Sequence, residues 1–297
     1  MLHIKNRFQK WGKLFFILIA LIILSGCILF VYGTFCENNI LTVTNYILKA
    51  DIISEIRIVQ LSDLHSVEFG INNSNLIKVI KEQKPDIIVM TGDMINEYDN
   101  DVSIICELIK KLSGIADVYY GYGNHETTWI SSHGDSFEKE ITKAGAVILN
   151  NSYLDVEIRG NSVRIAGYMG YYGAAHMTAY TEENQKADKA FMEDFENTDR
   201  YKILLDHIPT SWVDWNYIDK YPVDLVFSGH YHGGLIHIPL IERGLYAPYV
   251  GWFPQYTKGM YIGTKATCVL SAGLGSEYII PRINNPPEIV VVDLVPK

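Results

Sequence analysis

Residues 56–65, IRIVQLSDLH, join a short apolar run directly to polar side chains, and this junction decides the fold. Arg57 to Leu61 has the pattern of a buried strand, and Asp63 and His65 follow it at once. Because alternate residues of an extended segment point the same way, both side chains can face one site. The stretch therefore predicts a strand that delivers a carboxylate and an imidazole at its carboxyl end.

The same arrangement, a buried strand followed by polar residues, recurs four more times. The strands are predicted at residues 87–90, 118–122, 203–205 and 225–227. The motifs that follow them are Gly92-Asp93, Gly123-Asn124-His125-Glu126, Asp206-His207 and Gly229-His230-Tyr231-His232-Gly233-Gly234. Ligands of open α/β sheets bind beyond the carboxyl ends of the strands, so these side chains are expected to converge.

The segments between these strands predict an α/β fold with two sheets. Helical spacing of apolar residues appears at 75–82 and 102–112, and a polar helix is predicted at about 182–196. Strand–helix–strand alternation favours parallel pairing. Short strands at 146–149, 153–158 and 163–166 suggest an antiparallel meander that belongs to a second sheet. Late strands are predicted at 269–271 and 289–294, and no linker divides the chain.

The composition fits one sizeable core together with a membrane anchor. The chain has 297 residues, of which 48% are hydrophobic, and a formal net charge of −9. An acidic chain lacks the cationic field that attracts nucleic acid, so no nucleic-acid partner is expected. The four cysteines show no zinc-binding spacing, and a disulfide between Cys106 and Cys268 is left open.

The N-terminus predicts a membrane anchor in front of the domain. Residues 1–13 contain basic and no acidic side chains, and Leu14 to Tyr32 is uncharged. We expect a cytoplasmic tail at 1–13, a transmembrane signal anchor at 14–33, a connector at 34–55 and a catalytic domain at 56–297. By the positive-inside rule that domain lies outside the cell membrane.

Two other interpretations of the N-terminus stay open. Leu24-Ser25-Gly26-Cys27 resembles a lipoprotein signal in which Cys27 carries the lipid, although the following residues remain apolar. A cleaved signal peptide is the third possibility, but the apolar run exceeds the usual length of such a segment. The signal anchor and the lipoprotein signal would both tether the domain to a membrane.

The side chains at the five strand ends have the chemistry of metal ligands. They comprise two aspartates, one asparagine and five of the chain's nine histidines. Oxygen donors mixed with imidazole suit Mn²⁺, Fe or Zn²⁺ better than Ca²⁺ or Cu⁺. Glu126 and Asp206 have simpler interpretations, as a helix-start carboxylate and a strand-end polar residue.

The order DxH, GD, GNHE, HxP and GHxH resembles the calcineurin-like metallophosphoesterase superfamily. GHYHGG (229–234), IPLIERGLYAP (238–248) and GLGSEYIIPRINNPPEI (273–289) resemble its membrane-associated bacterial branch, which includes YaeI- and YkuE-like proteins. The resemblance runs from about Ile56 to the C-terminus. It implies a four-layer α/β/β/α sandwich of two mixed sheets.

The resemblance also implies a role for each candidate residue. One divalent metal ion (Mn, Fe or Zn) would be bound by Asp63, His65 and His232, and a second would be bound by the remaining ligands. Asp93 would bridge the two ions, and His125 would stand beside the scissile phosphate without binding metal. The ligands of the second ion would be Asn124, His207 and His230.

The expected activity is hydrolysis of a phosphodiester or pyrophosphate bond by a metal-bridging hydroxide. The anchor and the branch suggest a small-molecule or lipid phosphoester of the cell envelope as substrate. A membrane-tethered, non-catalytic metal-binding module is the alternative. A metalloprotease is disfavoured because the chain lacks an HExxH motif.

One position departs from the pattern of this branch. Its members often carry an arginine where this chain has Ala272. The absence of that arginine predicts an altered choice of substrate, and Arg282 is a candidate to replace it.

Overall fold

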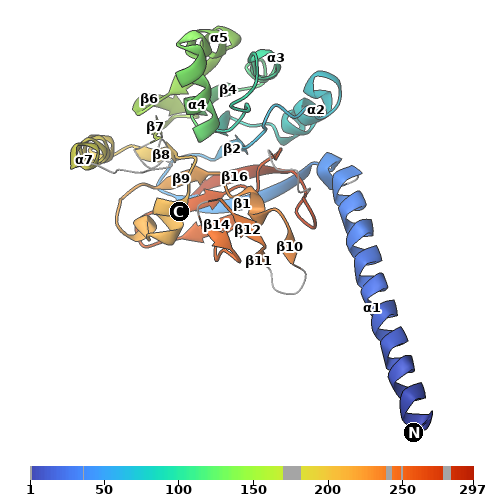
Figure 1. The fold of residues 1–297 in the computed structure, drawn as a ribbon. Coiled ribbons are helices and arrows are strands. Elements are labelled where there is room, and N and C mark those ends of the chain that lie inside the picture. The colour runs from blue at the N-terminus through green and yellow to red at the C-terminus, as the bar shows by residue number, and fades with distance from the viewer. Residues whose placement is uncertain (1, 36, 170–181, 239–242, 249, 277–281) are drawn as a thin grey trace.

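Two six-stranded sheets form the centre of the computed structural model (Figure 1). The structure describes residues 2–35, 37–169, 182–238, 243–248, 250–276 and 282–297. The first sheet has the order β1-β16-β2-β3-β4-β5, in which only the β16–β2 pair is antiparallel. Its strands are β1 (Thr42–Ala50), β2 (Ile56–Leu61), β3 (Ile87–Thr91), β4 (Asp117–Gly121), β5 (Ala146–Leu149) and β16 (Glu288–Pro296).

The second sheet has the order β14-β15-β9-β8-β7-β6. Its four central strands are parallel, and an antiparallel strand lies at each edge. Its strands are β6 (Ser152–Ile158), β7 (Asn161–Gly167), β8 (Tyr201–Leu205), β9 (Leu225–Ser228), β14 (Gly259–Ile262) and β15 (Thr267–Leu270). Both sheets are therefore mixed, as predicted.

Helices cover the outer face of each sheet. They are α2 (Ser74–Gln83), α3 (Ser103–Leu112), α4 (Asn124–His133) and α5 (Ser136–Ala144) on the first sheet, and α7 (Glu182–Glu196) on the second. One apolar cluster fills the space between the first sheet and its helices, another lies between the sheets, and a third lies under the second sheet's outer layer. These layers confirm the predicted α/β/β/α sandwich.

Short elements complete the described chain. They are the helical turns η1 (Glu37–Asn39), η2 (Ile71–Asn73), η3 (Thr210–Asp214), η4 (Tyr217–Asp219) and η5 (His232–Gly234), and the two-residue strands β10 (His237–Ile238), β11 (Arg243–Gly244), β12 (Tyr246–Ala247) and β13 (Gly251–Trp252). β12 and β13 form a small hairpin that adjoins η5.

The burial of the strands explains why their sequences are apolar throughout. All five residues of β3 and all four of β9 are buried, because each strand has a layer on both faces. Helix α3 instead buries one stripe, formed by Ile105, Leu108, Ile109 and Leu112. Both the continuous apolar runs of the strands and the apolar stripe of the helix can be recognised in the sequence.

The predicted meander was wrong in one strand. Residues 146–149 form β5, which pairs in parallel with β4 in the first sheet, whereas β6 and β7 form an antiparallel pair in the second. The polar turn at Asn150-Asn151 carries the chain from one sheet to the other. A short turn between two strands is compatible with a change of sheet, so strand spacing alone could not reveal it.

The connector predicted at residues 34–55 contains a strand that the sequence analysis missed. Residues 42–50 form β1, which pairs with β16 almost 250 residues away. Its alternating exposed and half-buried side chains belong to an edge strand with one covered face. The partner that defines such a strand is remote in sequence, so local pattern gave a weak signal.

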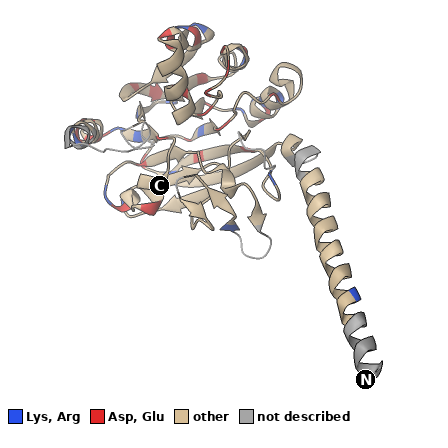
Figure 2. Cartoon of the chain, viewed as in Figure 1, with Lys and Arg blue, Asp and Glu red and all other residues tan. Residues whose placement is uncertain are grey.

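Helix α1 (Leu2–Phe35) extends away from the sandwich (Figure 1). Its stretch Trp11–Tyr32 has 22 residues, a mean hydropathy of 3.2 and no buried part. Lys13 is the single charged residue of this stretch, and Figure 2 draws the described part of the helix almost entirely in tan. This helix is long and apolar enough to cross a bilayer, as a membrane anchor or as a signal sequence.

Candidate metal centre

The carboxyl ends of five parallel strands meet on one side of the sandwich, which we call the site edge. β2, β3 and β4 of the first sheet and β8 and β9 of the second all end there. The motifs that follow these strands bring their carboxylate and imidazole groups into one buried cluster. This arrangement agrees with the prediction from the sequence that these remote motifs converge.

The first group of this cluster contains Asp63, His65 and His232. One ligand atom of each lies within 4.8 Å of the others, and all three residues are buried. Nε2 of His232 is 3.7 Å from Oδ1 of Asp63, and the rings of His65 and His232 are 5.1 Å apart. These are the three residues that the resemblance assigned to one ion.

The second group contains Asp93, His207 and His230. Their ligand atoms also lie within 4.8 Å of one another, and their side chains are buried. Nε2 of His207 lies 2.9 Å from Oδ2 of Asp93 and 3.9 Å from Oδ1 of Asp63. His207 therefore joins the two groups, and the two carboxylates face one shared space.

The hydrogen bond made by Nδ1 of His207 indicates whether the space between the two carboxylates suits a cation. Its Nδ1 lies 2.6 Å from the carbonyl oxygen of Thr91, which can only accept, so Nδ1 must donate. In the neutral ring Nε2 then presents a lone pair to the Asp93 carboxylate at 2.9 Å. Two acceptors at that distance repel unless a proton or a cation lies between them, so the donor set fits a metal ion.

His65 is oriented in a similar way by a residue that the sequence analysis did not single out. Nδ1 of His65 lies 3.1 Å from Oδ1 of Asn96, whose Nδ2 donates to the His65 carbonyl oxygen. This pairing leaves Nε2 of His65 for the cluster. Partners that fix the ring of a ligating histidine are typical of metal sites.

Asn124 and His125 begin helix α4 beside the second group. Oδ1 of Asn124 is buried, and among the described residues it accepts no hydrogen bond. The backbone N–H of His125 donates to Oδ1 of Asp93, and Nε2 of His125 lies 3.9 Å from Oδ2 of the same carboxylate. All eight predicted residues therefore lie at or beside the cluster.

The hydrogen bond at Nδ1 of His125 determines which of its ring nitrogens carries the proton. Its Nδ1 accepts a hydrogen bond from the backbone N–H of Glu97 at 3.0 Å. In the neutral ring the proton must then be on Nε2, the atom nearer to the Asp93 carboxylate. The chain thus holds His125 with an N–H directed into the site.

Burial and charge shift the ionisation of the cluster. Burial raises the pKa of Asp63 to about 6, and the neighbouring Asp93 carboxylate adds to the rise. Burial would also raise the pKa of Asp93, but His207 outweighs it and holds that pKa well below its usual range. Burial lowers the pKa of His230 and of His232, which keeps both imidazoles neutral, as metal ligation requires.

The backbone of the cluster is unusual in a way that the sequence did not reveal. Five candidate ligands have a positive φ between 48° and 69°, a region that costs free energy for residues with a side chain. They are Asp63, His65, Asp93, His230 and His232. A Cβ on Gly123 would collide with Asp93, and one on Gly229 would collide with Asp63. Close backbone approach to the two carboxylates therefore requires these glycines.

Glu126 has a larger role than the predicted helix-start carboxylate. It occupies the first turn of α4 and is completely buried. Its carboxylate accepts hydrogen bonds from the backbone N–H groups of Gly123, Asp93 and Met94, and from the hydroxyl of Tyr120. It thus fixes the loop that carries Asp93, and the spacing of a capping box was the only signal for it.

Two further residues have contacts that restrict their roles. Asp206 accepts a hydrogen bond from Nε1 of Trp212, while the ring of His207 is fixed by Thr91. Arg282 is buried and its guanidinium donates to the carbonyl oxygen of Gly275. Its charge contributes to the low pKa of His232, so it lies near the site.

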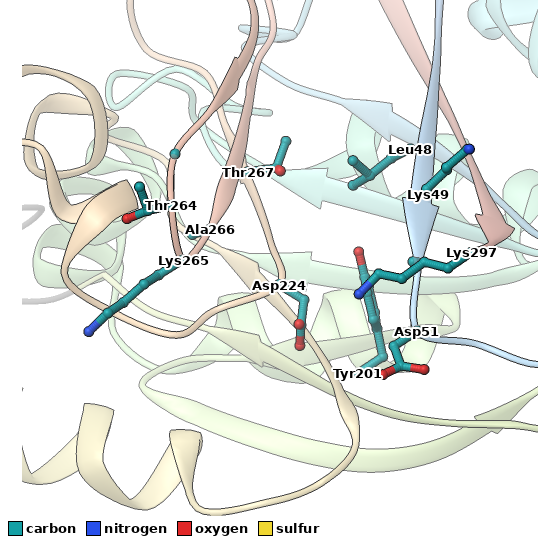
Figure 3. Close-up of a pocket in the computed structure, with 12 residues that line it drawn as sticks. Leu48, Lys49, Asp51, Tyr201, Asp224, Thr264, Lys265, Ala266, Thr267 and Lys297 are labelled. Atoms are coloured by element: carbon teal, nitrogen blue, oxygen red, sulfur yellow. The ribbon is translucent and has the colours of Figure 1, made fainter.

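A separate hollow lies at the opposite ends of the strands, which we call the far edge (Figure 3). Its volume is about 160 Å³, and none of the eight candidate residues lines it. Its lining includes Lys49, Asp51, Tyr201, Asp224, Lys265 and Lys297. It is therefore distinct from the cluster at the site edge.

Comparison with known proteins identifies the family. The model of the calcineurin-like phosphoesterase family matches residues 56–234, which is more than half of the chain and includes all eight candidate residues. The chain belongs to the calcineurin-like phosphoesterase family. Members of this family use divalent metal ions, and the buried Asp and His groups could bind them.

Similar proteins support the predicted bacterial branch. The chain is 29% identical to the uncharacterized metallophosphoesterase YkuE of Bacillus subtilis (strain 168), over 89% of this chain and 88% of that protein. It is 24% identical to the phosphodiesterase YaeI of Escherichia coli (strain K12), over 90% of this chain and 93% of YaeI. A 5′-nucleotidase precursor of Thermus thermophilus matches with a TM-score of 0.47 and 13% identity, over 81% of this chain and 54% of that one.

Proposed function

We propose that this phosphoesterase binds two divalent metal ions at the site edge and hydrolyses a phosphodiester or pyrophosphate bond. The observation that carries the proposal is the meeting of Asp63 and Asp93 around His207 in a buried cluster. Two buried carboxylates in one cluster are costly unless positive charge offsets them, and metal ions would supply that charge.

In this proposal the two groups of the cluster bind one ion each. Asp63, His65 and His232 hold the first, and Asp93 is shared between both. Asn124, His207 and His230 hold the second. Mn²⁺, Fe or Zn²⁺ there would offset charge on the phosphoryl oxygens and lower the pKa of a bound water.

His125 stabilises the leaving oxygen in the proposed reaction. The N–H of Glu97 donates to its Nδ1, so the Nε2 proton is directed into the site. From that position Nε2–H can donate a hydrogen bond to the leaving oxygen and stabilise its developing negative charge, a contribution of about 10²–10³-fold in rate. Asn96, Thr91 and Glu126 position the neighbouring groups through the hydrogen bonds described above.

We further propose that α1 is a retained anchor with its basic end in the cytoplasm, and that the substrate is a phosphoester of the cell envelope or of a lipid. The length and exposure of Trp11–Tyr32 and the absence of acidic residues before it support this topology. The side chains of residues 2–10, which carry most of the basic flank, lie outside the described part of the chain.

Hydrolysis of bis-p-nitrophenyl phosphate by the purified full chain tests the proposal. Activity should require added Mn²⁺ and disappear with a chelator. Asp93→Ala should reduce kcat/KM by about 10³-fold, because metal stabilisation of a phosphoryl transition state is worth several kcal/mol. Asp51→Ala at the far edge is the control and should change it less than about twofold.

The outcomes also decide between hydrolase and binding module. Undiminished activity in Asp93→Ala would refute the proposed centre. A chain that binds two metal ions but cleaves no monoester, diester or pyrophosphate would instead be the non-catalytic module.

A further inference from the structure

The start of β1 lies at the site edge, beside the candidate metal ligands. β1 is parallel to β16, and β16 is antiparallel to β2, so the first residue of β1 lies level with the end of β2, with β16 between them. Thr42 pairs with Glu288, whose backbone N–H donates to the carbonyl oxygen of Gly273. A Cβ on Gly273 would lie 2.6 Å from the Cβ of Asp63.

A second connection joins the same place to the segment after α1. Oδ1 of Asn38, in η1, accepts a hydrogen bond from the backbone N–H of Arg282. The Arg282 guanidinium donates to the carbonyl oxygen of Gly275, and the Gly275 N–H donates to the carbonyl oxygen of Asp63. Three hydrogen-bonded steps therefore lead from Asn38, three residues after the end of α1, to the candidate ligand Asp63.

The chain between these points is short. Residues 33–41 separate Tyr32, the last residue of the apolar stretch, from Thr42. Nine residues reach at most about 30 Å when fully extended. The end of the apolar stretch Trp11–Tyr32 is thus within about 30 Å of the start of β1, at the site edge, whereas the far edge lies at the opposite ends of the strands.

Exposed apolar side chains occur in the segments that neighbour the candidate ligands in the chain or are hydrogen-bonded to them. Tyr98 is 85% exposed and follows Glu97, whose N–H binds His125. Trp252 and Phe253 are 67% and 55% exposed. They belong to the segment held by Leu245, which donates to the Gly234 carbonyl two residues after His232. Ile40 and Val67 add further exposed apolar surface beside Asn38 and His65.

We propose that the site edge is a membrane-docking face, on which Ile40, Val67, Tyr98, Trp252 and Phe253 contact the bilayer that α1 crosses. Tyrosine and tryptophan favour the level of the lipid headgroups, where a phosphoester would meet the metal centre. The lipid bilayer is the partner because the tether enters the domain at this edge. A consequence of this docking is that the substrate is carried by a lipid of the same leaflet, and this part of the inference rests on the proposed function.

A spin label on the full chain in phosphatidylglycerol–phosphatidylcholine vesicles tests the docking itself. It is attached at Trp252→Cys or, as the control, at Ile262→Cys, with Cys27, Cys36 and Cys106 changed to Ser. Ile262 is 68% exposed and lies opposite Thr267, at the far edge. The label at 252 should be accessible to lipid-dissolved oxygen and the label at 262 to an aqueous nickel reagent. Equal aqueous accessibility at both positions would overturn the proposal.

Matched charge substitutions test the consequence for the substrate. Tyr98→Glu with Trp252→Glu is compared with Ile53→Glu with Ile262→Glu, since Ile53 is 79% exposed at the far edge. The readout is the ratio of hydrolysis of a vesicle-borne phospholipid to hydrolysis of soluble bis-p-nitrophenyl phosphate. That ratio should fall on the order of tenfold in the first pair alone. Equal ratios in both pairs would contradict the lipid substrate. Failure of the wild type to cleave any monoester, diester or pyrophosphate, soluble or vesicle-borne, would refute the hydrolase, while the spin labels still decide the docking.

Discussion

The two ends of the same strands differ sharply in how they hold charge. At the site edge, Asp63 and Asp93 are buried with histidines, and their hydrogen bonds come mainly from the backbone. At the far edge, Lys49 and Asp51 are exposed and Asp224 is paired with Lys202 at 3.2 Å. Buried charge is expensive and solvated charge is not. The comparison shows that the fold buries carboxylates at the site edge, where bound metal ions would offset the cost of that burial.

Removal of the His125 side chain should cause a large loss of activity at the site edge. His125→Ala should reduce kcat by about 10²–10³-fold, because the Nε2–H donor directed into the site is lost. Bound metal, measured by plasma mass spectrometry, should stay at the wild-type level. His133→Ala, at the other end of the same helix, should alter kcat less than about twofold. Loss of metal from His125→Ala would mean that this residue is a ligand.

Substitution of Glu126 should affect stability as well as activity. In Glu126→Gln one side-chain NH₂ must face a donor, either a backbone N–H or the Tyr120 hydroxyl. An unsatisfied buried donor costs about 1–3 kcal/mol, measurable by urea unfolding of the metal-free domain. The Asp93 loop should shift, so kcat should fall. Glu138→Gln, at an exposed residue that accepts a hydrogen bond from the Tyr122 hydroxyl, should leave kcat unchanged. Wild-type stability in Glu126→Gln would remove its positioning role.

The pH dependence of the metal-free chain should report on His207. Burial alone would lower its pKa, but Asp93 and Asp63 outweigh that effect and raise it to about 10. A raised pKa adds stability that is fully present below pH 6.5 and is lost as pH rises through 10. The Tm of chelator-treated protein should therefore fall by several degrees from pH 6.5 to 10. With Mn²⁺ bound this fall should disappear, because His207 is already deprotonated. A flat profile without metal would contradict the close contact of His207 with Asp93.

The sequence predicted the parts of the molecule that local pattern controls. Local sequence was sufficient for the buried strands and for the helices α2, α3 and α7. It was also sufficient for the five motifs at the strand ends, because each is recognised from the order of a few neighbouring residues. The edge strand β1 and the placement of β5 depend on partners far along the chain, so they were missed or misplaced. The left-handed backbone at His230 and the four hydrogen bonds of Glu126 follow from packing, which residue order does not encode locally.

Anomalous diffraction from crystals soaked in Mn²⁺ would test the paired metal centre most directly. Two peaks are predicted at the site edge, one contacted by Asp63, His65 and His232, the other by Asn124, His207 and His230, with Asp93 between them. A single peak, or peaks only at the far edge near Asp51 and Asp224, would contradict the account.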